Sequence, residues 1–140
     1  MDFQKITHVY LLGIGGIGMS GLARYFNYLG KKVAGYDKTP SELTIELAAE
    51  DILVHYDDDL NQLPSEFLKV EKSCLLLIYT PAIPKQHNEL NWFRLNGYIF
   101  YKRSEVLGFI SKNYKTVAVA GTHGKTTKAL LRLIFYTILR

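Results

Sequence analysis

The chain has 140 residues, of which 48% are hydrophobic and 21% are charged, and its formal net charge is +4. These values are typical of a globular protein with one domain and a short appendage, and they exclude disordered and fibrous chains. No apolar run approaches the roughly 20 residues that cross a bilayer, and the basic residues form no dense cluster, so we expect a protein that binds neither membrane nor nucleic acid. Because the amino terminus at residues 1–5 lacks the features of an export signal, we expect a cytoplasmic protein.

Short apolar runs alternate with segments of helical periodicity along the chain. This alternation predicts an α/β fold, a Rossmann-like open parallel sheet of about five strands with flanking helices. We expect the strands at residues 8–12, 32–36, 52–54, 74–79 and 98–101, and helices after residue 18, after residue 42, and near residues 89–95 and 105–111. A sixth strand at 116–120, a phosphate loop and a last helix would form the appendage.

The start of the second helix carries a capping pattern. Thr39 is predicted to be the N-cap, Pro40 the first helical residue, and Glu42 the glutamate of a capping box. Gly30 is predicted to end the first helix. These signals place a helix after each of the first two strands.

A glycine-rich turn joins the first strand to the first helix, with Gly13, Gly15 and Gly18 in the GxGxxG spacing. We expect Gly13 to permit the tight turn, Gly15 to let the backbone approach a ligand, and Gly18 to pack the helix on the strand. Amides at the helix start would then face an anion. Asp37 follows about 20 residues later, where a carboxylate commonly reaches a ribose hydroxyl. Taken alone, this unit predicts a nucleotide site of the kind found in NAD-binding domains.

A second glycine-rich turn follows the strand expected at 116–120, and it is similar to a P-loop except that Val119 stands where the usual spacing has a glycine. Its backbone would hold the phosphates of ATP. Lys125 would neutralise charge on the β and γ phosphates, and Thr126 would join a Mg²⁺ shell, which makes these two the candidate catalytic residues. The expected ATP-binding residues are Gly121, Thr122, His123, Gly124, Lys125, Thr126 and Thr127.

Several polar or reactive residues are given no functional role. The acidic run at 57–59 has no companion ligands at a recognisable spacing, which predicts a solvated turn instead of a metal site. The isolated His8, His87 and Trp92 are more often structural or exposed than ligating. Cys74, the single cysteine, is expected to pack within a strand.

Together with residues 80–84, 88–90 and 101–107, the two glycine loops make the sequence resemble the Mur ligase family over about residues 9–127. The resemblance implies a UDP-sugar-binding domain at 1–112 and the truncated start of a central ATP-binding domain at 113–140. It also implies a set of residues that contact the UDP substrate: Gly13, Gly15, Gly16, Ile17, Gly18, Met19, Ser20, Asp37, Thr80, Ala82, Ile83 and Arg103.

The activity that the resemblance implies is ATP-dependent ligation of L-alanine to UDP-N-acetylmuramic acid in peptidoglycan synthesis, with ATP and Mg²⁺ as cofactors. The remaining central and carboxy-terminal domains of a full enzyme would be partners of this fragment, which we expect to bind the UDP moiety and to be inactive alone. The chain departs from the family pattern at His55-Tyr56, where Gly-His is frequent, and at Lys128.

Three alternatives stay open from the sequence. A murein-peptide ligase of the same family has a similar second loop. An NAD-dependent oxidoreductase domain would account for the first loop and Asp37, but it leaves residues 121–127 unexplained. A nucleotide sensor without enzymatic activity is the third.

Overall fold

The structure is a computed structural model that describes residues 2–112. Its strands are β1 (His8–Leu12), β2 (Lys32–Tyr36), β3 (Leu53–His55), β4 (Leu75–Tyr79) and β5 (Phe100–Lys102). Its α-helices are α1 (Ile17–Tyr28), α2 (Glu42–Ala49), α3 (Ser65–Lys69), α4 (Asn88–Leu95) and α5 (Arg103–Ser111), and two 3-10 turns lie at Leu60–Gln62 and Lys72–Cys74.

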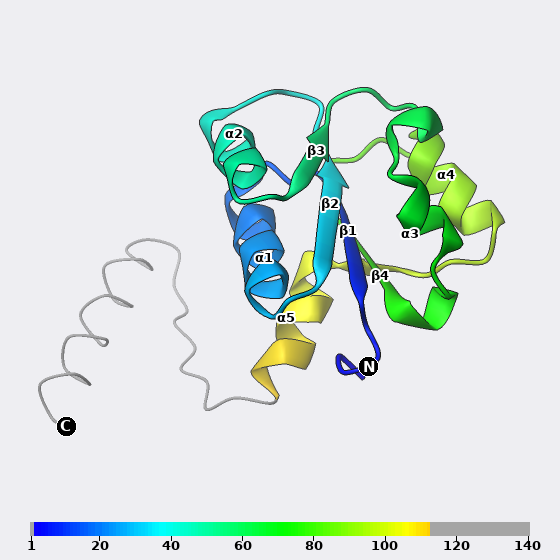
Figure 1. The fold of residues 1–140 in the computed structure, drawn as a ribbon. Coiled ribbons are helices and arrows are strands. Elements are labelled where there is room, and N and C mark those ends of the chain that lie inside the picture. Colours follow the sequence, from blue (N-terminus) through cyan, green and yellow to red (C-terminus); the bar gives the residue numbers. More distant parts are fainter. Residues whose placement is uncertain (1, 113–140) are drawn as a thin grey trace, which may run out of the picture. The chain divides into compact units, whose positions relative to one another are not determined.

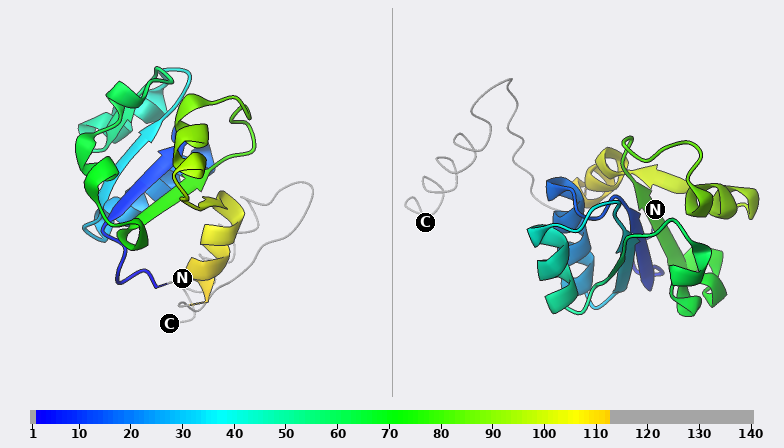
Figure 2. Two further views of the ribbon diagram at one scale, coloured as in Figure 1. Left: turned by 90° about the vertical axis from the view of Figure 1, so that its right-hand side faces the viewer. Right: turned by 90° about the horizontal axis from the view of Figure 1, so that it is seen from above.

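The five strands form one parallel sheet in the order β3-β2-β1-β4-β5. The first three strands run outward from β1 on one side, and the chain then returns to place β4 on the other side of β1. Helices α1 and α2 cover one face of the sheet, and α3 and α4 cover the other (Figures 1 and 2). This is the doubly wound arrangement, in which ligands bind beyond the carboxyl ends of the strands at the switch point, here between β1 and β4.

Side chains of the central strand β1 are buried on both faces of the sheet. Tyr10 and Leu12 belong to a cluster with Phe67 of α3 and Phe93 of α4, and all four are at most 1% exposed. Successive side chains of a strand point to opposite faces, so Val9 and Leu11, which are also fully buried, lie toward the α1 side. Burial on both faces explains why the central strands are continuous apolar runs instead of alternating ones.

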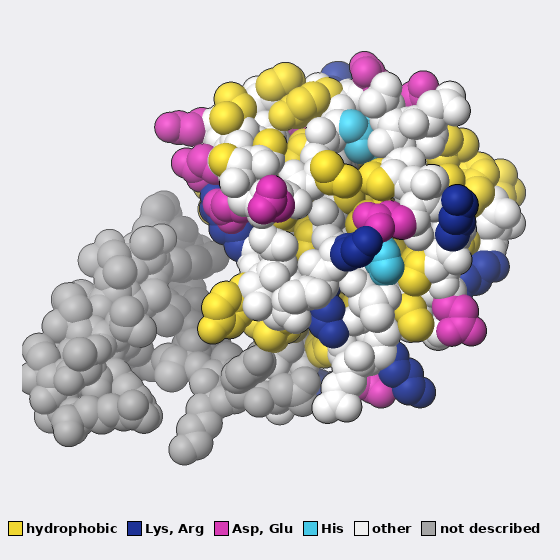
Figure 3. Space-filling view, in the orientation of Figure 1, with side chains coloured by type: hydrophobic (Ala, Val, Ile, Leu, Met, Phe, Trp, Pro, Cys, Tyr) yellow, Lys and Arg dark blue, Asp and Glu magenta, His cyan; other side chains and the backbone are white. Residues whose placement is uncertain are grey.

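The two helices on the α1 side are joined by an ion-pair cluster. Arg24 of α1 lies 2.7 Å from a carboxylate oxygen of Glu46 and 2.9 Å from one of Glu50. On the face that Figure 3 shows, basic and acidic side chains are interspersed. Exposed ion pairs such as Arg24–Glu46 and Arg24–Glu50 each add little stability. The apolar faces of α1 and α2 must therefore contribute most of the free energy that holds these helices on the sheet.

The predicted sheet of five parallel strands is confirmed, with small shifts at element ends. β3 and β5 begin one and two residues later than expected, and Cys74 ends a 3-10 turn instead of opening β4. The delay of β5 has a local cause: Gly97 adopts φ +76°, and the amide of Tyr98 bonds back to Phe93, so this segment closes the end of α4. α5 begins at Arg103, two residues before the expected start.

The predicted cap of α2 is wrong. Ser41 is the N-cap, and its hydroxyl accepts the amide of Thr44 at 3.3 Å while the Thr44 hydroxyl accepts the amide of Ser41 at 2.8 Å. Thr39 lies before the helix, where its amide donates a hydrogen bond to the carboxylate of Asp37. Helix α3 was not predicted, since five residues are too few to show helical periodicity.

The strand expected at 116–120, the phosphate loop 121–127 and the last helix lie outside the described residues. The expected domain boundary at 112 falls at their edge and stays a prediction. Within residues 2–112, none of the helices has the length and apolar character needed to pass through a membrane.

Candidate functional site

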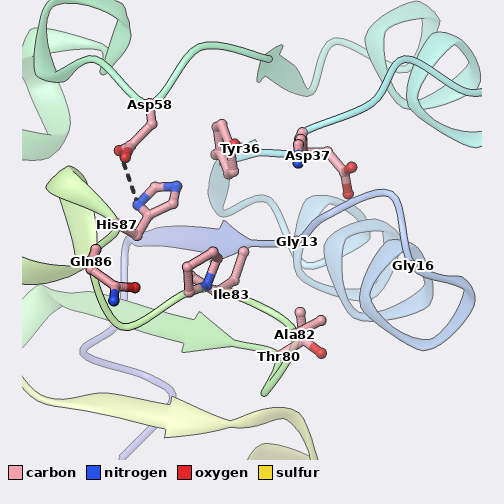
Figure 4. A pocket seen from close by; sticks show the side chains of 12 residues that line it. Gly13, Gly16, Tyr36, Asp37, Asp58, Thr80, Ala82, Ile83, Gln86 and His87 are labelled. Carbon is pink, nitrogen blue, oxygen red and sulfur yellow. Dashed lines mark ion pairs between the residues drawn. The ribbon is translucent and has the colours of Figure 1, made fainter.

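A cleft of about 650 Å³ opens at the carboxyl ends of β1, β2 and β4, at the switch point of the sheet. A volume of this size suits a small-molecule ligand. Figure 4 shows the cleft with Gly16 near one end and His87 near the other. The lining residues are Gly13, Gly16, Tyr36, Asp37, Lys38, Asp58, Thr80, Ala82, Ile83, Pro84, Gln86 and His87.

The start of α1 offers unpaired backbone amides next to the cleft. Gly16 is the N-cap residue, it supplies no capping side chain, and the first turn carries no acidic residue. The amide of Gly16 bonds to Gly13 and that of Met19 bonds to Gly16, whereas no acceptor within residues 2–112 takes the amides of Ile17 and Gly18. Free amides and the positive end of the helix dipole together attract an anion such as a phosphate.

The glycines of this loop serve partly different purposes from those predicted. Gly13 has φ +87°, which confirms its role in the tight turn. At Gly15 a Cβ would lie 2.8 Å from both Asp37 Oδ2 and Thr44 Cγ2, so Gly15 makes room for these side chains, and the approach of its backbone to a ligand stays a prediction. Gly18 does not pack on a strand, because its Cβ position faces the Arg103 side chain at 2.7–3.1 Å.

Arg103 thus brings a permanent positive charge to the helix start. It is the first residue of α5, directly after β5, and its guanidinium lies against Gly18 beside the unpaired amides. A guanidinium can donate two parallel hydrogen bonds to a phosphate. The helix start and Arg103 thus offer two free amides and one positive charge at the same end of the cleft.

Asp37 occupies the middle of the cleft in a fixed orientation. Its two carboxylate oxygens accept the amides of Gly15 at 2.8 Å and Thr39 at 3.1 Å. The loop after β4 lines the cleft as well, through Thr80, Ala82 and Ile83. A carboxylate held in this way can still accept a hydrogen bond from a ribose hydroxyl through its remaining lone pairs.

Two of the expected ligand residues face elsewhere. Met19 and Ser20 are each 2% exposed on the buried side of α1, and the Ser20 hydroxyl donates to the carbonyl of Ile17. Their side chains therefore do not line the cleft. The ligand contacts of the whole predicted set stay predictions.

The far end of the cleft holds a polar pair that was not predicted. His87 Nδ1 lies 3.1 Å from Asp58 Oδ1, and a dashed line joins the two side chains in Figure 4. Asp58 also accepts the amides of Asn88 at 2.8 Å and Glu89 at 3.2 Å, so it fixes the start of α4. The prediction of a purely solvated acidic turn is wrong for Asp58. Both residues follow the carboxyl ends of parallel strands, and that position could have identified them from the sequence.

A buried hydrogen-bonded network lies beneath the cleft. The Tyr10 hydroxyl bonds the carboxyl group of Glu89, which is fully buried, and lies 2.7 Å from His55 Nε2. His55 Nδ1 lies 3.0 Å from the carbonyl oxygen of Asp57. Burial raises the pKa of Glu89 to about 7, raises the pKa of Tyr10 and lowers the pKa of His55. His55, where the family pattern differs, therefore bonds within the core.

Glu89→Gln is expected to abolish the pH dependence that this carboxyl imposes on stability. An acid whose pKa rises on folding stabilises the fold below its unfolded pKa, and that contribution is lost as pH rises toward the folded value near 7. A rise from 4.5 to about 7 corresponds to about 3 kcal/mol. Urea unfolding should thus show the Gln variant more stable than the unsubstituted chain at pH 8 and similar at pH 5.

The exposed Glu71→Gln is the matched control, and it should leave the pH dependence unchanged. Parallel pH profiles for the unsubstituted chain and the Glu89 variant would contradict the raised pKa.

The family model described as "Mur ligase family, catalytic domain" matches residues 8–115. The chain belongs to the Mur ligase family. This confirms the resemblance stated from the sequence.

Named relatives agree with this assignment. The chain is 58% identical over 127 residues to the UDP-N-acetylmuramate–L-alanine ligase of Cytophaga hutchinsonii, covering 91% of this chain and 27% of that protein. It is 54% identical over 126 residues to the enzyme of the same name from Porphyromonas gingivalis, covering 90% and 27%. The chain therefore spans little more than a quarter of the length of these Mur ligases.

Solved structures show the same fold. The UDP-N-acetylmuramate:L-alanyl-gamma-D-glutamyl-meso-diaminopimelate ligase from Neisseria meningitides superposes with a TM-score of 0.76 at 27% identity, over 89% of this chain and 37% of that one. The UDP-N-acetylmuramate-alanine ligase of Thermotoga maritima gives a TM-score of 0.66 at 24% identity, over 76% and 23%.

Proposed function

We propose that the chain is the UDP-substrate-binding portion of a Mur ligase that joins L-alanine to UDP-N-acetylmuramic acid in peptidoglycan synthesis. The observation that carries this proposal is the pair of unpaired amides, Ile17 and Gly18, beside a cleft at the switch point. The relatives at 58% and 54% identity, both named for the alanine ligase, support the choice of substrate.

The ligand would lie along the cleft with its diphosphate at the start of α1. There the two free amides and Arg103 would neutralise its charge. The ribose would lie near the carboxylate of Asp37, and Thr80, Ala82 and Ile83 would contact the uridine from the loop after β4.

The catalytic half of the reaction belongs to residues beyond this cleft. We propose that residues 121–127 hold ATP, with Lys125 on the β and γ phosphates and Thr126 in a Mg²⁺ shell. L-alanine would bind in the remaining domains of a longer protein. The 140-residue chain should therefore bind the UDP moiety and release no phosphate from ATP, and we place the protein in the cytoplasm.

A murein-peptide ligase is the second candidate, favoured by the TM-score of 0.76 to the Neisseria enzyme. The higher sequence identities to alanine ligases favour the first proposal. Ligation assays on the full-length enzyme, with ATP and UDP-N-acetylmuramate, separate the two, since the first proposal expects turnover with L-alanine and the second with a peptide. The family match also favours a ligase over an NAD-dependent oxidoreductase.

Calorimetry tests the binding function. UDP-N-acetylmuramate titrated into the 140-residue chain should bind with a dissociation constant on the order of 10–100 µM, in the range of ordinary enzyme substrates. NADH should bind far more weakly. Absence of heat at millimolar UDP-N-acetylmuramate, or tighter binding of NADH, would overturn the proposal, and robust ATP turnover would overturn the expectation that the chain alone is inactive.

A further inference from the structure

His87 presents an unpaired polar atom at the end of the cleft that lies opposite the anion site. The residue is only 4% exposed, and its Nε2 atom is buried with no hydrogen-bond partner in the described part of the chain. Leaving a buried polar atom unpaired costs about 1–3 kcal/mol, so such atoms are uncommon in folded proteins. An unpaired nitrogen on a cleft-lining side chain points to a ligand that supplies the missing partner.

The second nitrogen of the ring determines what that partner must be. Nδ1 lies 3.1 Å from Asp58 Oδ1 and 3.5 Å from the amide nitrogen of Leu90. The contact with Asp58 is shorter and involves a carboxylate, whereas 3.5 Å is at the limit for a hydrogen bond, so Nδ1 carries the hydrogen. Burial lowers the pKa of His87 against the opposing effect of Asp58, which leaves the ring neutral at pH 7. Nε2 is therefore a hydrogen-bond acceptor without a donor.

The groups between the two ends of the cleft indicate which part of a nucleotide reaches His87. The lining there includes the apolar surfaces of Tyr36 and Ile83, with Asp37 closer to the helix start (Figure 4). The Tyr36 ring packs edge-on against His87, with ring centroids 4.5 Å apart at an interplanar angle of 70°. A diphosphate bound beside Gly16 and a ribose at Asp37 would leave the flat base alongside Tyr36 and Ile83, with its edge toward His87.

We propose that His87, oriented by Asp58, is a specificity-determining residue that accepts a hydrogen bond from the imide N–H of a uracil ring through Nε2. The inference rests on the proposed function and identifies how the same cleft selects its base. Cytosine has an unprotonated ring nitrogen in place of the imide N–H, so two acceptors would face each other and the buried Nε2 would stay unpaired. A site built to pair with a donor rejects a ligand that lacks it.

Calorimetry with UDP and CDP tests the proposal, because the two ligands carry the same diphosphate and ribose. At pH 7.5 the 140-residue chain should bind UDP at least about 10-fold more tightly than CDP, which corresponds to one unpaired buried acceptor. In His87→Ala and His87→Phe the two affinities should come within about two-fold of each other. Lys85→Ala, an exposed substitution in the same loop, should keep the original ratio.

Nitrogen NMR of the unsubstituted chain is a second test, and it does not depend on whether the His87 variants fold. The Nε2 resonance of His87 should have the chemical shift of an unprotonated nitrogen and should move when UDP binds. Equal affinity of the unsubstituted chain for UDP and CDP, an unchanged ratio in folded His87 variants, or an Nε2 signal insensitive to UDP would overturn the inference. In each of these cases UDP still binds and the proposed function stands; failure of the unsubstituted chain to bind UDP at all would overturn both.

Discussion

Gly35→Ala is expected to lower the free energy of unfolding by about 3 kcal/mol, the upper part of the usual range for overpacking a core. A Cβ at this position in β2 would lie 2.4 Å from the carbonyl oxygen of Leu11 and 2.8–2.9 Å from the side chain of Ile14. The first of these neighbours is backbone of the central strand and cannot rotate away. Urea unfolding followed by circular dichroism measures the loss.

Gly21→Ala is the control for this substitution. Gly21 lies in the interior of α1, and beyond its own stretch of helix no atom lies within 4 Å of an added Cβ. Replacing glycine by alanine in a helix interior stabilises by about 0.5–1 kcal/mol. Equal stability of Gly35→Ala and Gly21→Ala would contradict the close contact of Gly35 with Leu11 in β1 and with Ile14 in the loop that follows β1.

Gly16→Asp is expected to weaken UDP binding at least about 100-fold while leaving stability unchanged or slightly higher. Gly16 has φ −67° and ψ 144°, which any residue adopts, and its Cβ would meet nothing closer than 3.6 Å. Aspartate is a favoured N-cap residue because its carboxylate accepts amides of the first helical turn. That carboxylate would occupy the amides that the diphosphate needs and would repel its charge.

Gly16→Asn separates these two causes. Asparagine also caps helices and has nearly the same shape, but it carries no charge. We expect it to weaken UDP binding much less than Gly16→Asp does, with both variants as stable as the unsubstituted chain. UDP binding by Gly16→Asp with unchanged affinity would show that the anion does not bind at the start of α1.

The sequence was sufficient to predict those parts of the site whose residues lie close together in the sequence. The turn at Gly13, the first helix and the carboxylate of Asp37 all lie within one strand-helix-strand unit, where periodicity and spacing determine the geometry. The same reasoning did not show that Gly15 also makes room for the side chains of Asp37 and Thr44. Whether a glycine makes room for a ligand or for a neighbouring side chain depends on tertiary packing that spacing does not report.

The far end of the cleft could not be predicted in the same way. Asp58 and the start of α4 are about 30 residues apart in sequence, and their contact arises because β3 and β4 end at the same edge of the sheet. Glu89 looks like an ordinary helix residue in the sequence, yet it is fully buried against Tyr10. Its burial depends on which face of α4 packs on the sheet, and only the assembled core determines that.

Amide NMR tests the central claim most directly, namely that the bare start of α1 binds the diphosphate of a uridine nucleotide. In a titration of the 140-residue chain with UDP, the amide resonances of Ile17 and Gly18 should show the largest shifts and saturate together. Unchanged Ile17 and Gly18 signals, with the shifts concentrated instead near Lys72 and Tyr98 around the separate hollow that they line, would contradict the account.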